Sequence, residues 1–234
     1  YRVAGAGIEP FNQDACDVDV YLTASPKGLA CPAGLILITA GARALDALER
    51  RATPPMGFAT DLIQWQPVMQ AMEAGRFGYF NTPALNLTLA INVGLELILE
   101  EGLEARWSRH ARLATAMRAG LDALGLELRA QPGLRSNALS TVRYPQGVGR
   151  ELLDLCKADG VVLAGGYHPQ LGPETFRIGH LGWVTSADVI ATIEALARNL
   201  HKLGAVGREA PGQALAAVSA ALGDPVHAPA LAVN

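Results

Sequence analysis

One lysine separates two apolar runs in the stretch Tyr21-Leu-Thr-Ala-Ser25-Pro-Lys27-Gly-Leu-Ala-Cys-Pro-Ala-Gly34-Leu-Ile-Leu-Ile38. Short apolar runs bounded by glycine and proline are typical of buried strands, so we expect strands of a buried sheet over 17–24 and 34–40. A lysine at the end of a strand, among small residues, can be partly desolvated. Desolvation favours the neutral amine, which is a nucleophile able to form a Schiff base. The alternative is a surface lysine in an ordinary connection between strands.

The composition excludes several classes of protein. Of the 234 residues, 50% are hydrophobic and 18% are charged, and the net charge is −3. A disordered chain would be less apolar, and the nearly balanced charge gives no reason to expect nucleic-acid binding. The most apolar stretch, 84–99, contains Asn86, Asn92 and Glu96 and is too short to span a bilayer. We therefore expect neither a nucleic-acid nor a membrane partner.

The cysteines and histidines show no pattern typical of metal ligands. Cys16, Cys31 and Cys156 are odd in number and form no C-x-x-C pair. Reduced, buried thiols are the simplest interpretation, and they favour a cytoplasmic location. His168 and His180 have no metal-ligand spacing to a cysteine or carboxylate, so we interpret them as structural or rim residues and predict no metal site.

The first segment, 1–102, has the pattern of an apolar α/β region. Its last helix is expected to open at Thr82, as the N-cap before Pro83, and to stop at Gly102. Because this helix is apolar nearly all round, we expect it to be buried. The other helical elements expected in the segment are a helix over 43–51 and a helical turn near 62–73, within an irregular stretch over 56–78.

The second segment, 103–204, is more charged and alternates between helical and strand patterns. The elements expected in it are helices over 103–124, 150–159 and 186–204, and strands near 127–130, 138–144, 161–164 and 175–178. The third segment, 205–234, is rich in alanine, glycine and proline, with one weak helix near 213–222. We expect it to be a loosely attached tail.

Four stretches occur in an order and approximate spacing found in one known family: Val18-Asp-Val-Tyr-Leu-Thr-Ala-Ser25-Pro-Lys27-Gly-Leu, Pro32-Ala-Gly34, Tyr79-Phe-Asn-Thr82-Pro83 and Phe176-Arg177-Ile-Gly-His-Leu-Gly182. Together they resemble the class V aminotransferases, which use pyridoxal phosphate (PLP) and include alanine–glyoxylate and serine–pyruvate aminotransferases. The resemblance covers roughly residues 1–204. No single stretch is decisive, but the ordered set is specific.

The resemblance implies an α/β protein of the PLP-dependent transferase fold type I. In that fold, 1–102 would be the C-terminal part of the large PLP-binding domain with a linking helix, 103–204 the small C-terminal α+β domain, and 205–234 a tail. The chain opens on Tyr1 without a methionine. Compared with the family, we expect the large domain to be incomplete, with roughly its first half missing.

The resemblance also implies transamination between a small amino acid, alanine or serine, and a 2-oxo acid, glyoxylate or pyruvate, by a PLP-containing homodimer. Lys27 would hold the cofactor as a Schiff base and act as the catalytic acid and base, with Ser25 near the phosphate. Tyr79 and Thr82 would reach the phosphate of the neighbouring subunit's cofactor, and Arg177 would bind the substrate α-carboxylate. The structural alternatives are a turn contact for Ser25, packing and capping for Tyr79 and Thr82, and an internal ion pair for Arg177.

Two departures from the family pattern keep other functions open. Pro26 stands where the family commonly has a glutamine that binds phosphate, and Tyr1 stands where it has the aspartate that keeps the pyridine nitrogen protonated. These departures motivate a degenerate, non-catalytic scaffold or interaction subunit as the alternative. A desulfurase or lyase of the same superfamily is the other alternative, although such enzymes usually place a histidine directly before the lysine and need a mobile, nucleophilic cysteine.

Overall fold

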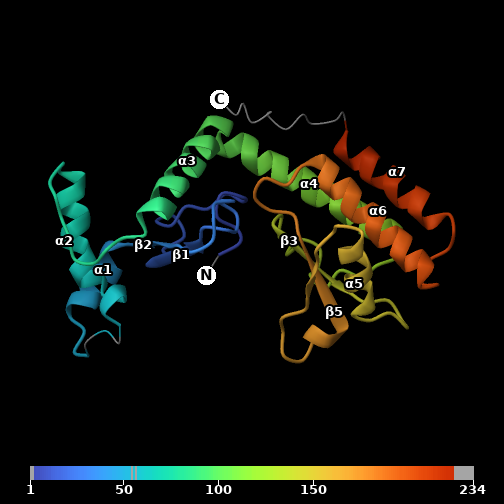
Figure 1. Cartoon of the computed structure of the whole chain (residues 1–234), viewed down its shortest axis with the longest axis horizontal. Helices are drawn as coiled ribbons and strands as arrows, with labels where there is room; N and C mark the ends of the chain where they lie inside the picture. Colours follow the sequence, from blue (N-terminus) through green and yellow to red (C-terminus); the bar gives the residue numbers. More distant parts are fainter. Residues whose placement is uncertain (1–2, 54, 56, 224–234) are drawn as a thin grey trace.

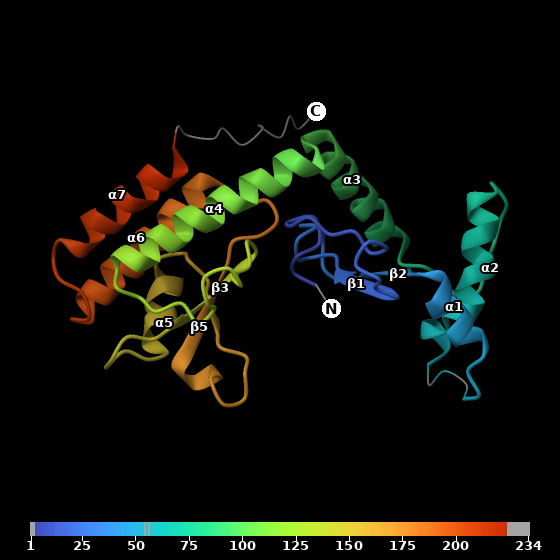
Figure 2. The same cartoon turned by 180° about the vertical axis from the view of Figure 1, so that it is seen from behind.

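The computed structural model describes residues 3–53, 55 and 57–223. Figures 1 and 2 show two regions joined by an elbow between two long helices. We call residues 3–102 the N-terminal region and residues 103–223 the C-terminal region. The N-terminal region contains β1 (Val20–Ala24), β2 (Ile36–Ala40), α1 (Ala42–Glu49), the 3-10 helix η1 (Phe58–Thr60), α2 (Leu62–Glu73) and α3 (Leu85–Glu101).

β1 and β2 form a two-stranded antiparallel sheet, in register from Val20 opposite Ala40 to Ala24 opposite Ile36. The two strands were expected, but the prediction that they lie in a buried sheet is wrong for the described residues. The side chains of Val20, Ile36 and Ile38 are exposed. A two-stranded sheet covers little of its own surface, so apolar strand residues stay in contact with solvent unless other elements pack on them.

α2 is a complete helix where the sequence indicated only a helical turn. The side chain of Asp61 caps it by accepting a hydrogen bond from Ile63 N at 3.1 Å. Its range, Leu62–Glu73, is the one expected for the helical turn, and Pro67, which lies inside the helix and removes one amide donor, is why the residue pattern did not read as a regular helix. The preceding helix, α1, agrees with its predicted range to within two residues at each end.

α3 differs from its prediction in two ways. It begins at Leu85 with Ala84 as the N-cap, so Thr82 does not cap it. Its buried residues are Ile91, Gly94 and Ile98, whereas the remaining apolar surface is largely exposed, so the prediction of a buried helix is wrong here. The helix ends at Gly102 as predicted, where φ is +81°, a left-handed value that favours glycine.

The C-terminal region combines a packed group of helices with a small antiparallel sheet of order β3-β5-β4, which α4 contacts at β3. α4, α6 and α7 pack side by side, as both views show. The strand expected near 127–130 is reduced to one bridge, Leu128 to Val142. The elements of this region are α4 (Leu103–Ala123), β3 (Leu139–Arg143), α5 (Glu151–Ala158), β4 (Ala164–Gly165), the 3-10 helix η2 (Gly172–Glu174), β5 (Thr175–Gly179), α6 (Ser186–Lys202) and α7 (Ala210–Leu222).

α7 belongs to the core of the C-terminal region. Ala214, Val218 and Leu222 are buried in the same apolar cluster as α4 and α6. The expectation of a loosely attached tail is therefore wrong for the described part of 205–234, because one apolar face of a short, alanine-rich helix is enough to dock it. Within the described residues, no helix combines the length and apolar character needed to cross a membrane.

Candidate active site

The turn that carries Lys27 follows directly on β1. Lys27 N donates to Ala24 O at 3.2 Å, and Ala30 N donates to Lys27 O at 2.9 Å. Ala30 has a φ of +55°, a left-handed conformation that costs a residue with a Cβ about 1–2 kcal/mol. The side chain of Lys27 is exposed and has no hydrogen-bond or ion-pair partner among the described residues. The partial desolvation expected for this amine is thus not provided by the part of the chain that the structure describes.

The hydroxyl of Ser25 is engaged inside the same loop. Ser25 is fully buried, and its Oγ donates to Pro32 O at 2.7 Å and accepts from Leu35 N at 3.3 Å. These two bonds tie the loop between β1 and β2 together, which corresponds to the structural alternative for this residue. A contact between Ser25 and a cofactor phosphate stays a prediction.

Arg177 lies on β5 and is half-buried. Its Nε donates to Gly165 O at 2.8 Å, and its Cζ lies 5.7 Å from the ring centroid of Tyr167. No ion pair links Arg177 to a carboxylate within the described residues. Because the internal ion pair proposed as the alternative is not found there, the two terminal amino groups of the guanidinium can still bind a carboxylate in two-pronged geometry.

Tyr79 and Thr82 lie together on the exposed segment before α3. Their hydroxyl oxygens are 3.0 Å apart, and Tyr79 is 62% exposed. Because the hydroxyl of Thr82 meets Tyr79, it does not cap α3. In the described part of the chain, no hydrogen bond joins this pair to the Lys27 turn. The structure therefore pairs these two predicted residues with each other, and no described hydrogen bond connects them to the predicted lysine.

The Lys27 turn packs against the turn that follows β5. A Cβ built on Gly182 would lie 3.5 Å from Lys27 O and 2.9 Å from Ala30 Cβ, and Gly182 has a φ of +79°. Only glycine fits this close approach without moving the turn. The chain thus brings the Lys27 turn next to the segment that leads out of the Arg177 strand, although the two are about 150 residues apart in sequence.

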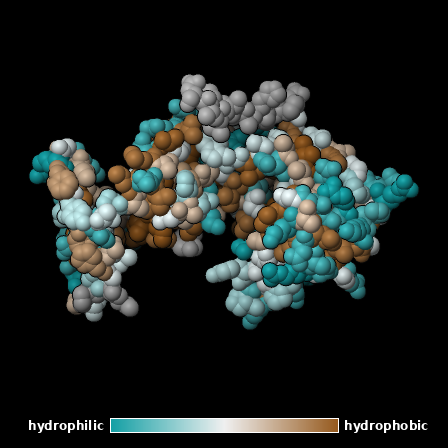
Figure 3. Space-filling view, in the orientation of Figure 1, coloured by the Kyte–Doolittle hydropathy of each residue, from teal (hydrophilic) through white to brown (hydrophobic). Residues whose placement is uncertain are grey.

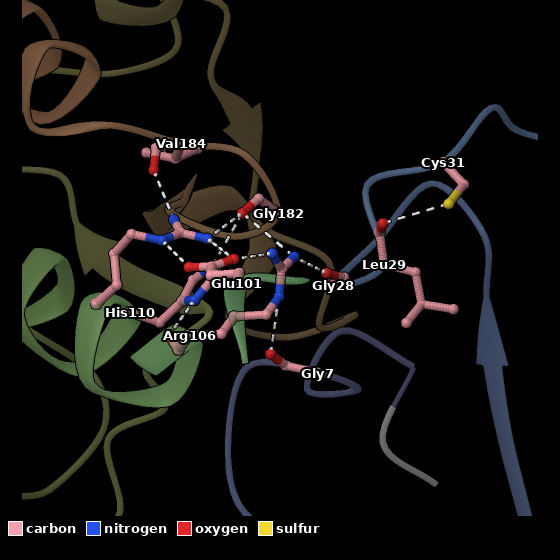
Figure 4. A network of polar contacts seen from close by, with 10 residues as sticks. Gly7, Gly28, Leu29, Cys31, Glu101, Arg106, His110, Gly182 and Val184 are labelled. Atoms are coloured by element: carbon pink, nitrogen blue, oxygen red, sulfur yellow. Dashed lines mark hydrogen bonds and ion pairs between the residues drawn. The ribbon is translucent and has the colours of Figure 1, made fainter. Parts of the chain in front are cut away.

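A network of charged side chains lies behind the two turns, and the sequence analysis did not identify it. Glu101, at the end of α3, binds Arg106 Nη1 at 2.8 Å and Arg109 Nε at 2.6 Å (Figure 4). Burial alone would raise the pKa of Glu101, but hydrogen bonds from Arg109 and Arg106 hold it below its usual range. In sequence, a glutamate followed by two arginines at the start of a helix resembles an ordinary solvated face, so no pattern distinguished this network.

Two histidines near these turns are buried and neutral. His180 Nδ1 is 2.9 Å from Asn137 O, and its Nε2 is 3.0 Å from the hydroxyl of Ser140. A neutral ring that donates from Nδ1 and accepts at Nε2 satisfies both contacts. Burial lowers the pKa of His180 to about 4, and burial together with the neighbouring Arg109 lowers that of His110 to about 4.

The cysteines bear on the desulfurase alternative. Cys31 and Cys156 are buried, and burial raises the pKa of both thiols above the usual value. A thiol with a raised pKa carries little thiolate and is a poor nucleophile. Cys16 is exposed.

Among the described residues, no group of three or more histidine, cysteine or acidic side chains could hold a metal ion. Tyr1, at the predicted position of the family aspartate, lies outside the described residues.

Known proteins resemble this chain in sequence along most of its length. No protein-family model matches it. An uncharacterized aminotransferase of Methanocaldococcus jannaschii is 36% identical over 204 residues, which are 86% of this chain and 51% of that protein. Alanine–glyoxylate aminotransferase 1 of Saccharomyces cerevisiae is 36% identical over 77% of this chain and 48% of its own length. The chain thus spans about half the length of the curated relatives it matches.

The solved structures that resemble this chain are also aminotransferases. Pyridoxamine–pyruvate aminotransferase of Mesorhizobium loti has a TM-score of 0.85 at 28% identity, covering 94% of this chain and 56% of that one. Ureidoglycine–glyoxylate aminotransferase of Bacillus subtilis has a TM-score of 0.82 at 27% identity, covering 92% and 56%. The fold predicted by resemblance, PLP-dependent fold type I, is confirmed. By sequence and by fold, this chain is a homologue of the class V aminotransferases.

Proposed function

We propose that a protein containing this chain transfers an amino group between a small amino acid, alanine or serine, and a 2-oxo acid, glyoxylate or pyruvate, with PLP as cofactor. The observation that carries the proposal is Lys27 on the turn after β1, exposed and without a partner among the described residues, in a chain 36% identical to an aminotransferase. Relatives named for glyoxylate or pyruvate as the partner of transamination support this choice of 2-oxo acid.

The described residues include the types of chemical group that PLP and its substrate require. The cofactor needs a primary amine for its aldehyde and donors for its phosphate, and its amino-acid partner needs a cation for the carboxylate. Lys27 offers an accessible amine, the adjacent hydroxyls of Tyr79 and Thr82 offer two donors, and Arg177 offers the cation. Ser25 fits less well, because its hydroxyl already bonds the backbone on both sides.

Each proposed role follows from the chemistry of the side chain. When bound, PLP supplies an electron-poor ring that stabilises negative charge at the Cα of the amino acid. Lys27 holds the cofactor through its amine and serves as the general acid and base that moves the proton at the substrate Cα. Arg177 binds the α-carboxylate and so orients the Cα–H bond toward Lys27.

The unit proposed for activity is a homodimer in the cytoplasm. Tyr79 and Thr82 are exposed and, among the described residues, form no hydrogen bond with the Lys27 turn of their own chain, which suits a role at the phosphate of the partner subunit. Figure 3 shows apolar side chains gathered over α3 and the neighbouring strands, a surface suited to burial by other protein. All three cysteines are free, which suits a reducing compartment.

The test is to locate the lysine that reacts with PLP. The protein is incubated with PLP and reduced with borohydride, and its peptides are mapped by mass spectrometry. The pyridoxyl group is expected on Lys27, and a Lys27→Arg variant, which keeps the charge but cannot react, should lose that label. A label confined to Lys157 or Lys202 would contradict the proposal. No labelling at all would favour the scaffold alternative.

A further inference from the structure

Arg106, on the first turn of α4, is fully buried and touches three separate parts of the chain. Its Nε donates to Gly7 O at 3.1 Å, and its Nη2 donates to Gly28 O at 2.8 Å and lies 3.4 Å from Gly182 O. Figure 4 shows the guanidinium placed between these carbonyl groups and the carboxylate of Glu101. One side chain of the C-terminal region thus ties together two loops of the N-terminal region and the turn after β5.

The contact with Gly28 is informative because Gly28 directly follows Lys27. The amine of Lys27 has no partner in the described part of the chain, so only its backbone fixes where it sits. That backbone is confined on its other side as well, since a Cβ on Gly28 would overlap Ala6 O. The left-handed Ala30 adds strain, which persists only where surrounding contacts hold it.

We propose that Arg106 is a positioning residue, which clamps the Lys27 turn against the Gly182 turn and so sets the distance between Lys27 and the Arg177 strand. The inference rests on the proposed role of Lys27. A guanidinium suits this task because its five donors lie in one rigid plane and can bond several carbonyl groups at once. Glu101 compensates the buried charge, and the ring of Trp183 lies 4.9 Å from Arg106 Cζ.

Arg109 provides a matched control within the same network. It also pairs with Glu101, it lies 3.4 Å from Gly182 O, and it donates to Val184 O at 3.0 Å. Within the part of the chain that the structure describes, it forms no hydrogen bond with Gly7 or Gly28, so it holds the Gly182 turn without holding the Lys27 turn. Replacing either arginine by methionine leaves Glu101 with one arginine partner. The two variants therefore differ chiefly in whether the Lys27 turn keeps its clamp.

The first readout is amide hydrogen exchange in the full chain, followed by mass spectrometry. In Arg106→Met, peptides covering 24–34 should exchange about tenfold faster, since hydrogen bonds from a charged donor to their carbonyl groups are lost. Peptides of α6 should not change, which separates a local from a global effect. Arg109→Met should leave 24–34 as in the parent protein, and Arg106→Lys, which keeps the charge without the planar fork, should lie between.

The second readout is where PLP attaches after borohydride reduction. In Arg106→Met, the share of pyridoxyl label on Lys27, relative to Lys157 and Lys202, should fall several-fold, and Arg106→Lys should restore part of it. A purely structural role would lower yield or melting temperature without moving the label between lysines. If Arg106→Met is insoluble, Arg106→Lys against Arg109→Lys decides the same comparison.

Three outcomes would overturn the inference. They are an unchanged exchange rate over 24–34 in the Arg106 variants, an equal acceleration in the Arg109 variants, and a pyridoxyl label that does not move between lysines in Arg106→Met. The two proposals fail in different ways. If the parent protein carries no label on Lys27, the proposed function is wrong, whereas the exchange experiment still decides whether Arg106 clamps the turn.

Discussion

The C-terminal region encloses a core, whereas the N-terminal region leaves much of its apolar surface in contact with solvent. Among the described residues, twenty buried apolar residues form one cluster in the C-terminal region, against five in the main cluster of the N-terminal region. In the first, α4 contacts β3 while α6 and α7 pack on α4, whereas in the second the small apolar cluster joins α3 to residues in and around the two strands (Figures 1 and 2). The number of layers, rather than the apolar content of the elements, decides how much is buried.

This difference teaches where the candidate site obtains its rigidity. Lys27 lies in the weakly enclosed region, yet its turn contacts α4 and the Gly182 turn, which belong to the well-packed region. A lysine on a two-stranded sheet alone would be poorly fixed. The network of Arg106, Glu101 and Arg109 extends the rigidity of the C-terminal core across the elbow at Gly102.

The sharpest test of the contrast uses one matched substitution in each region. Ile193→Ala, in the large cluster, should lower the free energy of unfolding by about 4 kcal/mol, and Ile98→Ala, in the small one, by about 2 kcal/mol, because a cavity costs more where surrounding atoms cannot collapse into it. Hydrogen exchange of α6 and α3 peptides in urea measures each region separately. Equal losses would mean that the two clusters are equally well packed.

Acid should weaken the C-terminal region before the N-terminal one, which has no histidine. The pKa of His180 is about 4 in the folded chain and about 6.5 when unfolded, so between these values the unfolded chain binds more protons. Its contribution is fully present above pH 6.5 and is lost as pH falls toward 4, by about 3 kcal/mol in total. Urea unfolding at several pH values measures the loss. His180→Asn should remove this share of the loss and leave the share of His110, whose pKa is also about 4. A pH dependence equal to that of the parent protein would contradict the lowered pKa of His180.

The exposed pair before α3 tests whether the solvent-exposed surface of the N-terminal region has a binding role. Tyr79→Phe with Thr82→Val removes both hydroxyls and keeps the volume nearly constant. PLP affinity should fall by about 2 kcal/mol, the loss expected for hydrogen bonds to a charged phosphate. Melting temperature should hardly change, since both residues are exposed. If titration gives the double variant the same PLP affinity as the parent protein, the two hydroxyls do not bind the cofactor and the pair has only a structural role.

A substitution of Arg177 tests whether the C-terminal region contributes to substrate binding at the candidate site. Arg177→Lys keeps the charge but loses the two-pronged geometry, so amino-acid affinity should fall about tenfold, or 1.4 kcal/mol, while cofactor content stays the same. Titration of alanine or serine into the PLP-loaded variant, followed by absorbance, gives the half-saturation. An unchanged value would show that Arg177 does not contact the substrate. Loss of soluble protein would favour a structural role instead.

The sequence predicted the type of most elements, because helix and strand patterns depend on neighbouring residues. The stripe of α6, the stop at Gly102 and the strand of Arg177 all follow from local periodicity and glycine conformation. The family was also predictable, since its motifs are short and keep their order along the chain. Lys27 follows a strand and Arg177 lies on a strand, as the local patterns indicated, whereas Thr82 is not the N-cap of α3. The roles of all five predicted site residues stay predictions.

Only the tertiary structure decided what covers each element and which distant groups meet. The sequence pattern of α3 predicts a buried helix, yet much of its apolar surface is exposed, and α7 was predicted to be part of a loose tail, yet it packs in the core. Burial depends on neighbouring elements, and the periodicity of one segment does not show which elements those are. Thr82 bonds Tyr79 instead of capping α3. The bonds from Arg106 to Gly7, Gly28 and Gly182 run to backbone carbonyl groups, which every residue possesses, so no sequence pattern could have marked them.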